Sequence, residues 1–177
     1  MVRQRFSLAL IVLHWLTVIA VVMAYLTQEM ELFEDSLGGE QWHYLFGLLI
    51  LISVMPRLLI RLLSPHPPIT PPISSAMLWV ARLTHLALYG FLILMPVVGW
   101  LLLNAEGESL TWQGFTLPTL IAPSEQWEEW LEKIHEAGAS AGYVLIGLHS
   151  GAALLHHVLL KDNTLRRMLP WTRKTAD

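Results

Sequence analysis

The chain has 177 residues, of which 54% are hydrophobic and 14% are charged. Soluble domains carry roughly 25% charged residues, so this composition excludes an ordinary soluble domain and favours a membrane protein. The absence of cysteine excludes iron–sulfur clusters, disulfide bonds and covalently attached c-type haem. The formal net charge of −3 is small, and the distribution of the charges is the informative property.

Four stretches of the chain are long and apolar enough to cross the roughly 30 Å hydrocarbon core of a bilayer. They cover about residues 6–27, 43–63, 77–103 and 134–160. The first begins M-V-R-Q-R like a signal peptide, but its apolar run is too long and no small-residue cleavage site follows, which favours a retained span. We therefore expect one all-α domain over residues 1–177, an integral membrane four-helix bundle.

The charged residues divide between the two sides of the predicted membrane. Twelve of the fourteen acidic residues lie within 29–40 and 106–136, in the two connections on one side, where Lys133 is the one basic residue. The other basic residues fall on the opposite side: Arg3, Arg5, Arg57, Arg61, Arg82, Lys161, Arg166, Arg167, Arg173 and Lys174. Because basic loops stay in the cytoplasm, this pattern predicts cytoplasmic termini and outer acidic connections.

The first two spans each contain one histidine. His14 lies in V-L-H-W-L, about 12 Å from the cytoplasmic end at the helical rise. His43 opens the second span at the outer surface, between Trp42 and Tyr44. Taken alone, His14 is explained by a hydrogen bond to a backbone carbonyl and His43 by an interfacial aromatic belt.

Two arginines lie on one face of the second span at its cytoplasmic end. Arg57 and Arg61 are either snorkelling topology anchors or, for one of them, the partner of a haem propionate, since a guanidinium binds a carboxylate bidentately. The linker S-P-H-P-P-I-T-P-P follows, and we expect it to be extended with His66 in solvent.

The third span places Arg82, His85 and Tyr89 on one face at helical spacing. His85 has about the same depth as His14. Three roles remain open for it: a competing ligand of an inner cofactor, a contact to a propionate or quinone, and a structural hydrogen bond.

The segments around the fourth span are predicted to lie at the membrane surfaces. S-E-Q-W-E-E-W-L-E-K, in the outer connection 104–133, favours a short amphipathic helix on the surface, within a loop that covers the bundle as a lid. The cytoplasmic tail K-D-N-T-L-R-R-M-L-P favours a last short helix with Asp162 or Asn163 as its cap.

The fourth span contains four of the eight histidines, namely His135, His149, His156 and His157. His135 and His149 are fourteen residues apart, so they share a helix face and lie about 21 Å apart along the axis. By depth, His149 matches His14 and His135 matches His43. The sequence thus predicts two metal centres, one near each surface, that share the fourth span.

Two imidazoles at each level are too few for a bare zinc or iron ion but suit the axial positions of a haem. Small residues allow a porphyrin to approach the helices, although the same residues serve small-xxx-small helix packing. These residues are Gly47, Gly138, Ala139, Ala141, Gly142, Gly147 and Gly151. A haem with two histidine ligands has no open position and typically carries electrons.

His156 is an alternative to His149 as the inner ligand, because it lies seven residues further on the same face. We favour His149 for its match in depth with His14. His156 and His157 lie near the cytoplasmic surface, where they would contact a quinone or a propionate, or relay protons.

The whole chain resembles the bacterial cytochrome b561 family. The resemblance rests on H-W in the first span, P-R-L-L-I-R, S-P-H-P-P, T-H-L-A-L-Y, I-H-E with G-L-H fourteen residues later, and H-H-V-L-L-K-D-N-T-L-R-R-M-L. It implies a small four-span protein of the bacterial inner membrane with two b haems, the inner held by His14 and His149 and the outer by His43 and His135.

The resemblance also implies electron transfer to or from ubiquinone, and one branch of the family is thought to oxidise superoxide at the outer side. The leading hypothesis is therefore a quinone-linked oxidoreductase with a small periplasmic donor and no catalytic side chain of its own. The alternatives are a haem-carrying anchor subunit of a larger dehydrogenase or hydrogenase and a histidine-lined metal transporter. Membrane lipid is an expected partner, a homodimer is compatible with the sequence, and nucleic acid is not expected because topology explains the basic residues.

Overall fold

The computed structural model describes residues 5–29 and 39–170, which form four long helices and little else. The helices are α1 (Leu8–Glu29), α3 (Gly39–Leu63), α4 (Ser75–Ala105) and α5 (Glu125–Val158). A hairpin of β1 (Thr111–Trp112) and β2 (Phe115–Thr116) and the 3-10 turn η2 (Arg166–Met168) complete the fold. All four helices are long and apolar enough to cross a membrane, which confirms the predicted all-α membrane bundle.

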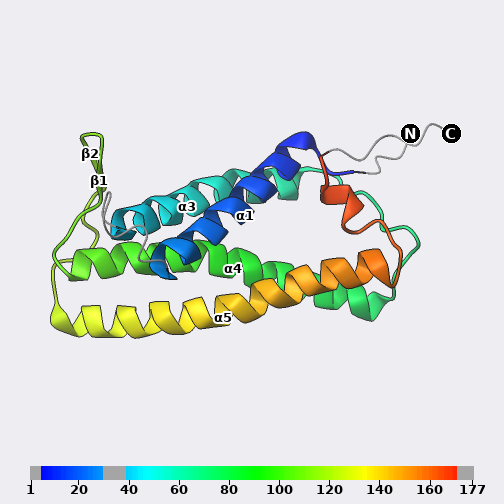
Figure 1. The fold of residues 1–177 in the computed structure, drawn as a ribbon. Helices are drawn as coiled ribbons and strands as arrows, with labels where there is room; N and C mark the ends of the chain where they lie inside the picture. Colours follow the sequence, from blue (N-terminus) through cyan, green and yellow to red (C-terminus); the bar gives the residue numbers. More distant parts are fainter. Residues whose placement is uncertain (1–4, 30–38, 171–177) are drawn as a thin grey trace.

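The helices run lengthwise beside one another (Figure 1), with α1 packed on α3, α3 on α4 and α4 on α5. One end of the bundle holds Arg57, Arg61, Arg82, Arg166 and Arg167 and is called the basic end here; the other holds Glu108, Glu125, Glu128, Glu129 and Glu132 and is called the acidic end. The sorting of charge to the two ends is thus confirmed for the described residues. Arg3, Arg173, Lys174 and the acidic residues within 30–38 lie outside them.

The buried core belongs to three of the helices. Ala20, Val21 and Ala24 of α1 pack against Ile50 and Val54 of α3 and Leu92 of α4, whereas α5 adds only the partly buried Ile146. Thr17 and Ser53 join α1 to α3 through their hydroxyls, 3.0 Å apart. The looser packing of α5 leaves space between this helix and the rest of the bundle. Five histidines line the cavities in this space, namely His14, His43, His85, His135 and His149.

The fourth helix begins earlier than predicted. Residues 125–133 do not form a separate surface helix, because they continue into the span as the first turns of α5. The Ser124 hydroxyl accepts a hydrogen bond from the Trp127 amide, and two glutamates occupy the first turn, where the helix dipole favours negative charge. No glycine or proline separates Glu125 from Glu136, so nothing in the chain interrupts the helix there.

The remaining outer connection packs against the end of α4 through Asn104, which is 1% exposed. Its side-chain amide donates to the Glu108 carbonyl and its oxygen accepts from the Leu120 amide. Leu110 and Leu117, in the hairpin arms, line the larger cavity of the bundle. This part of the connection therefore covers the cavity, as the predicted lid would.

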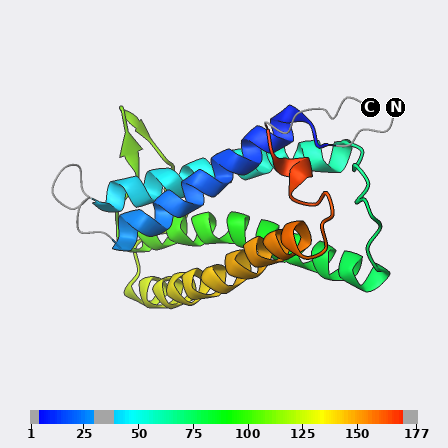
Figure 2. The same cartoon turned by 45° about the vertical axis from the view of Figure 1, so that its right-hand side comes forward.

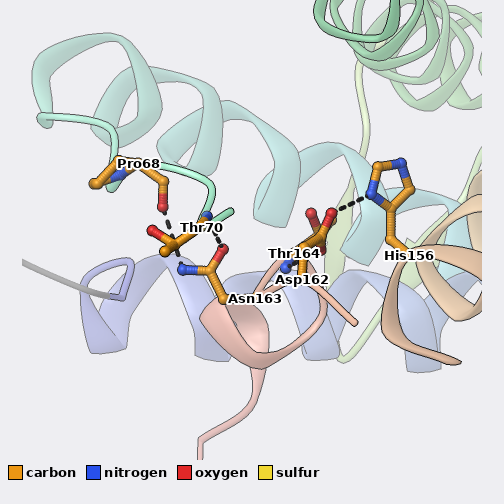
Figure 3. A network of polar contacts seen from close by, with 6 residues as sticks. All are labelled: Pro68, Thr70, His156, Asp162, Asn163 and Thr164. Carbon is orange, nitrogen blue, oxygen red and sulfur yellow. Dashed lines mark hydrogen bonds and ion pairs between the residues drawn. The ribbon is translucent and has the colours of Figure 1, made fainter. Parts of the chain in front are cut away.

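The tail crosses the basic end and ties three parts of the chain together (Figure 3). Asn163 donates to the Pro68 carbonyl and accepts from the Thr70 amide, and the Trp15 indole donates to the Met168 carbonyl. The predicted helix cap was wrong, because Asp162 instead accepts from the Thr164 amide two residues on, an Asx turn. The short helix is η2, whose first residue has no side-chain cap within the described chain.

Candidate functional site

The structure brings the histidines together in the two predicted pairs. The ring centroids of His14 on α1 and His149 on α5 lie 6.4 Å apart, near the basic end. The ring centroids of His43 on α3 and His135 on α5 lie 5.9 Å apart, near the acidic end. Both pairs use α5, because a spacing of fourteen residues returns to the same helix face.

The spacing within each pair fits a metal ion between the two imidazoles. A metal bound about 2 Å from each ligating nitrogen, with each nitrogen about 1 Å from its ring centroid, puts the two centroids about 6 Å apart. Nδ1 of His14 and Nδ1 of His135 are buried and find no hydrogen-bond partner among the described residues. A buried polar nitrogen without a partner costs about 1–3 kcal/mol, a cost that would be offset if that nitrogen bound a metal.

His43 has a defined tautomer. Its Nδ1 lies 2.9 Å from the Ala24 carbonyl oxygen, which only accepts, so Nδ1 carries the proton. Nε2 then keeps its lone pair and is available as a metal ligand. Metal-binding histidines are commonly oriented in this way, by a hydrogen bond from the ring nitrogen that does not bind the metal.

A cavity lies at each level. The acidic-end cavity, of about 760 Å³, is lined by His43, His135, Tyr25, Gly47 and Gly99 among others, and its volume falls within the roughly 300–1,000 Å³ typical of cofactor sites. The basic-end cavity, lined by His14, His85, His149, Arg57 and Tyr89, measures about 120 Å³. The first has the volume of a typical cofactor site, whereas the second is smaller than that range.

His85 belongs to the basic-end cavity but already has a partner. Its Nδ1 donates to the Ala81 carbonyl one turn earlier, and its ring centroid lies 5.5 Å from that of His149. The structural hydrogen bond proposed for it is therefore present. Of the two imidazoles facing His149, only that of His14 has a buried nitrogen without a partner in the described chain.

Arg57 and Arg61 have different surroundings. Arg57 is 9% exposed, lines the basic-end cavity, and places its guanidinium carbon 5.5 Å from the centroid of the Tyr89 ring. Its Nε is buried and unpaired within the described residues. Arg61 instead stacks over Phe6 at 5.0 Å and is not among the residues that line the two described cavities. Nη1 of Arg61 is also buried and unpaired within the described residues, but of these two arginines only Arg57 lines the cavity beside His14 and His149.

Comparison with known proteins identifies the family of the chain. The model of the prokaryotic cytochrome b561 family matches residues 5–171. The chain belongs to the prokaryotic cytochrome b561 family. It is 34% identical over 172 residues to cytochrome b561 homolog 1 of Escherichia coli K12, covering 94% of this chain and 98% of the relative. It is also 34% identical over 175 residues to a probable superoxide oxidase of Yersinia pestis, covering 97% of this chain and 99% of the relative.

Membership in the cytochrome b561 family makes the chain a multi-pass inner-membrane protein of electron transfer that binds b-type haem. A third relative, cytochrome b561 homolog 2 of Escherichia coli K12, is 34% identical over 128 residues, covering 72% of this chain and 68% of the relative. The predicted family and location are thus confirmed.

His156 faces the tail rather than the histidine pairs (Figure 3). Its Nδ1 lies 2.5 Å from Oδ2 of Asp162, a carboxylate that is almost fully buried. His156 is not among the residues that line the two cavities in the described chain. His66 is exposed in the linker, as predicted.

The Asp162 carboxylate should control how firmly the tail is held. Burial raises the pKa of this carboxyl, but hydrogen bonds from His156 and Thr164 outweigh burial and lower it below its ordinary value. A lowered folded-state pKa stabilises the docked tail above the unfolded value of about 4, and this stabilisation is lost as the pH falls through the folded-state pKa.

We expect Asp162→Asn to speed hydrogen–deuterium exchange of residues 161–170 about tenfold at pH 7, the equivalent of roughly 1.4 kcal/mol. Wild type should approach the variant as the pH falls below about 4, after correction for intrinsic rates. Glu129→Gln is the matched control, because Glu129 is exposed and pairs only with Lys133, at 3.7 Å, among the described side chains. Equal exchange in wild type and Asp162→Asn at pH 7 would contradict this role.

Several residues of the acidic-end site were not predicted. The Tyr25 hydroxyl donates to the Ala139 carbonyl at 2.8 Å and so ties α1 to α5 beside the cavity. Gly99 allows α4 to approach His135, since a Cβ there would lie 3.1 Å from the imidazole. A lone Tyr or Gly in an apolar span carries no pattern by which sequence would identify it.

Proposed function

We propose that the chain carries electrons across the inner membrane through two b haems. His14 and His149 hold the haem at the basic end, and His43 and His135 hold the haem at the acidic end. The observation that supports this assignment is the pair of centroid spacings, 6.4 and 5.9 Å, at two levels of one shared helix. The basic end faces the cytoplasm, as the distribution of basic residues favours.

Each bound haem supplies an iron that gains and loses one electron without an open coordination position. The side chains provide the rest of the mechanism. The hydrogen bond from His43 to the Ala24 carbonyl fixes the tautomer of that imidazole, and Arg57, stacked on Tyr89, would hold a propionate of the bound haem. The ligands on α5 set the two levels about 21 Å apart along the axis.

We further infer that the donor is a small periplasmic species and the acceptor is ubiquinone at the cytoplasmic side. Superoxide is the donor suggested by the name of the Yersinia relative. Two superoxide anions would each give one electron and leave as oxygen, and ubiquinone would take two electrons and two protons to become ubiquinol. The acidic end repels an anion, and its Lys133 is paired with Glu129.

The test uses haem-loaded protein in liposomes that contain ubiquinone, with superoxide generated outside and ubiquinol measured after extraction. We expect ubiquinol to form at least tenfold faster than in protein-free liposomes. The rate should rise several-fold between 10 and 100 mM salt, because the screening length falls from about 30 to about 10 Å and repulsion weakens. A rate that falls with salt would contradict the repulsion, and no ubiquinol formation would reject superoxide as donor. Co-purification of a large dehydrogenase subunit would favour the anchor alternative.

A further inference from the structure

The β1–β2 hairpin separates its side chains into an aromatic face and a threonine face. Trp112 pairs with Phe115 and Thr111 with Thr116 across the two strands. Directly opposed residues project to the same face and successive residues alternate, so Trp112 and Phe115 share one face. On the other face, the two threonine hydroxyls lie 2.9 Å apart. The side chains of Trp112 and Phe115 are nevertheless 57% and 68% exposed.

The hairpin has a fixed direction, because both its tip and its base are ordered by local contacts. Gln113 (φ 48°) and Gly114 (φ 83°) form the tip, and two positive φ values are typical of a tight type I′ turn. The Leu117 amide bonds the Leu110 carbonyl at 2.9 Å, and Asn104 fastens the base to α4. The hairpin is therefore more than a loose loop.

The hairpin projects sideways from the acidic end. In Figures 1 and 2 it stands away from the helices at a steep angle to their axes and passes beyond α3. Because the four helices cross the membrane, an element at a steep angle to them at one end lies along the membrane surface. Its residues 110–117, L-T-W-Q-G-F-T-L, carry no charge, although this end of the molecule is acidic.

We propose that this hairpin is a membrane-surface anchor, whose aromatic face inserts into the boundary between lipid headgroups and acyl chains. Its partner is the phospholipid surface itself. Tryptophan and other aromatic side chains concentrate at this boundary, and an uncharged ribbon enters it without burying charge. Trp127 and Trp130, each 59% exposed in the first turns of α5, lie at the same end. Since Leu110 and Leu117 line the acidic-end cavity, the anchor holds the covering loop in place over it.

The absence of cysteine permits a direct test. Phe115→Cys and Thr116→Cys place one nitroxide label on each face of the hairpin, in adjacent positions, in the haem-loaded protein in phospholipid nanodiscs. The ratio of collisions with oxygen to collisions with an aqueous nickel chelate reports the depth of the label. We expect this ratio to be at least threefold higher at position 115 than at position 116.

Three results would overturn the proposal. Equal, water-like ratios at both positions would place the hairpin in solvent. Exclusion of both reagents at position 115 would mean that a protein surface covers the aromatic face. A higher ratio at position 116 would mean that the threonine face is turned to lipid. Trp112→Cys repeats the measurement on the aromatic face, and an unchanged haem spectrum shows that each variant is folded.

Discussion

His149→Ala is expected to lower the content of b haem from two to one per chain and to abolish electron transfer across the membrane. His149 is the α5 member of the basic-end pair, 6.4 Å from His14, and alanine offers no ligand. His14→Ala should remove the same haem, whereas His43→Ala and His135→Ala should remove the other. A pyridine haemochrome count with reduced-minus-oxidised absorption spectra measures the number and the identity of the haem lost.

His66→Ala is the matched control, because this histidine is exposed in the linker and should leave both haems in place. His85→Ala should also leave two haems, since the proposal assigns the basic-end haem to His14 and His149 and gives His85 a structural hydrogen bond to the Ala81 carbonyl. Two haems surviving in His149→Ala would transfer the ligand role to His85 or His156. If the wild-type protein contained no haem, the two-haem proposal would be rejected and the alternative of a histidine-lined metal transporter would be favoured.

Much of the pairing of the histidines could be predicted from the helical period and from the depth of each histidine in its span. A spacing of fourteen residues returns to the same helix face, and hydrophobic length fixes how deep each histidine lies. These two quantities predict which histidines meet, and the structure places His14 beside His149 and His43 beside His135. Haem ligation itself stays a prediction.

The features that sequence did not predict depend on side-chain direction. His156 shares a helix face with His149, but its ring pairs with Asp162, six residues later in the chain. Asp162 lies beside His156 because the tail folds across the basic end. The sequence likewise predicts Asp162 or Asn163 as a helix cap, yet the bonds of Asp162 go to Thr164 and His156. Such choices are made by tertiary contacts rather than by local propensity.

The small residues of α5 show how structure separates two explanations that sequence could not. Gly138 and Gly142 are four residues apart and pack against Met95 of α4 and against Tyr25 of α1 with Phe91 of α4, respectively. They thus serve helix packing of the small-xxx-small kind. Gly47 and Gly147 have no atom of the described chain within 4 Å of an added Cβ, and Gly47 lines the acidic-end cavity. Of these four glycines, Gly47 alone both lines a described cavity and leaves space there for the close approach of a porphyrin.

Gly142→Ala is expected to destabilise the protein by about 1–3 kcal/mol and to remove the haem of the acidic end while the other haem stays. The added methyl group would overlap the Tyr25 hydroxyl and the Phe91 ring, so α5 must move away from α1 and α4. This movement breaks the bond from Tyr25 to the Ala139 carbonyl and distorts the cavity that Tyr25, Phe91 and Ala139 line. Thermal unfolding followed by haem absorbance, with a haemochrome count, measures both effects.

Gly147→Ala provides the comparison that assigns the cause. Both substitutions add one methyl group to the same helix, five residues apart, but the methyl group at position 147 meets no atom of the described chain within 4 Å. Alanine is a better helix former than glycine, so this variant should be neutral or more stable by about 0.5–1 kcal/mol and should keep both haems. Equal melting temperatures for the two variants would show that α5 does not pack on Tyr25 and Phe91. Loss of a haem only in Gly147→Ala would contradict this assignment. It would mean that a porphyrin lies against Gly147 and that Gly142 has room for a methyl group.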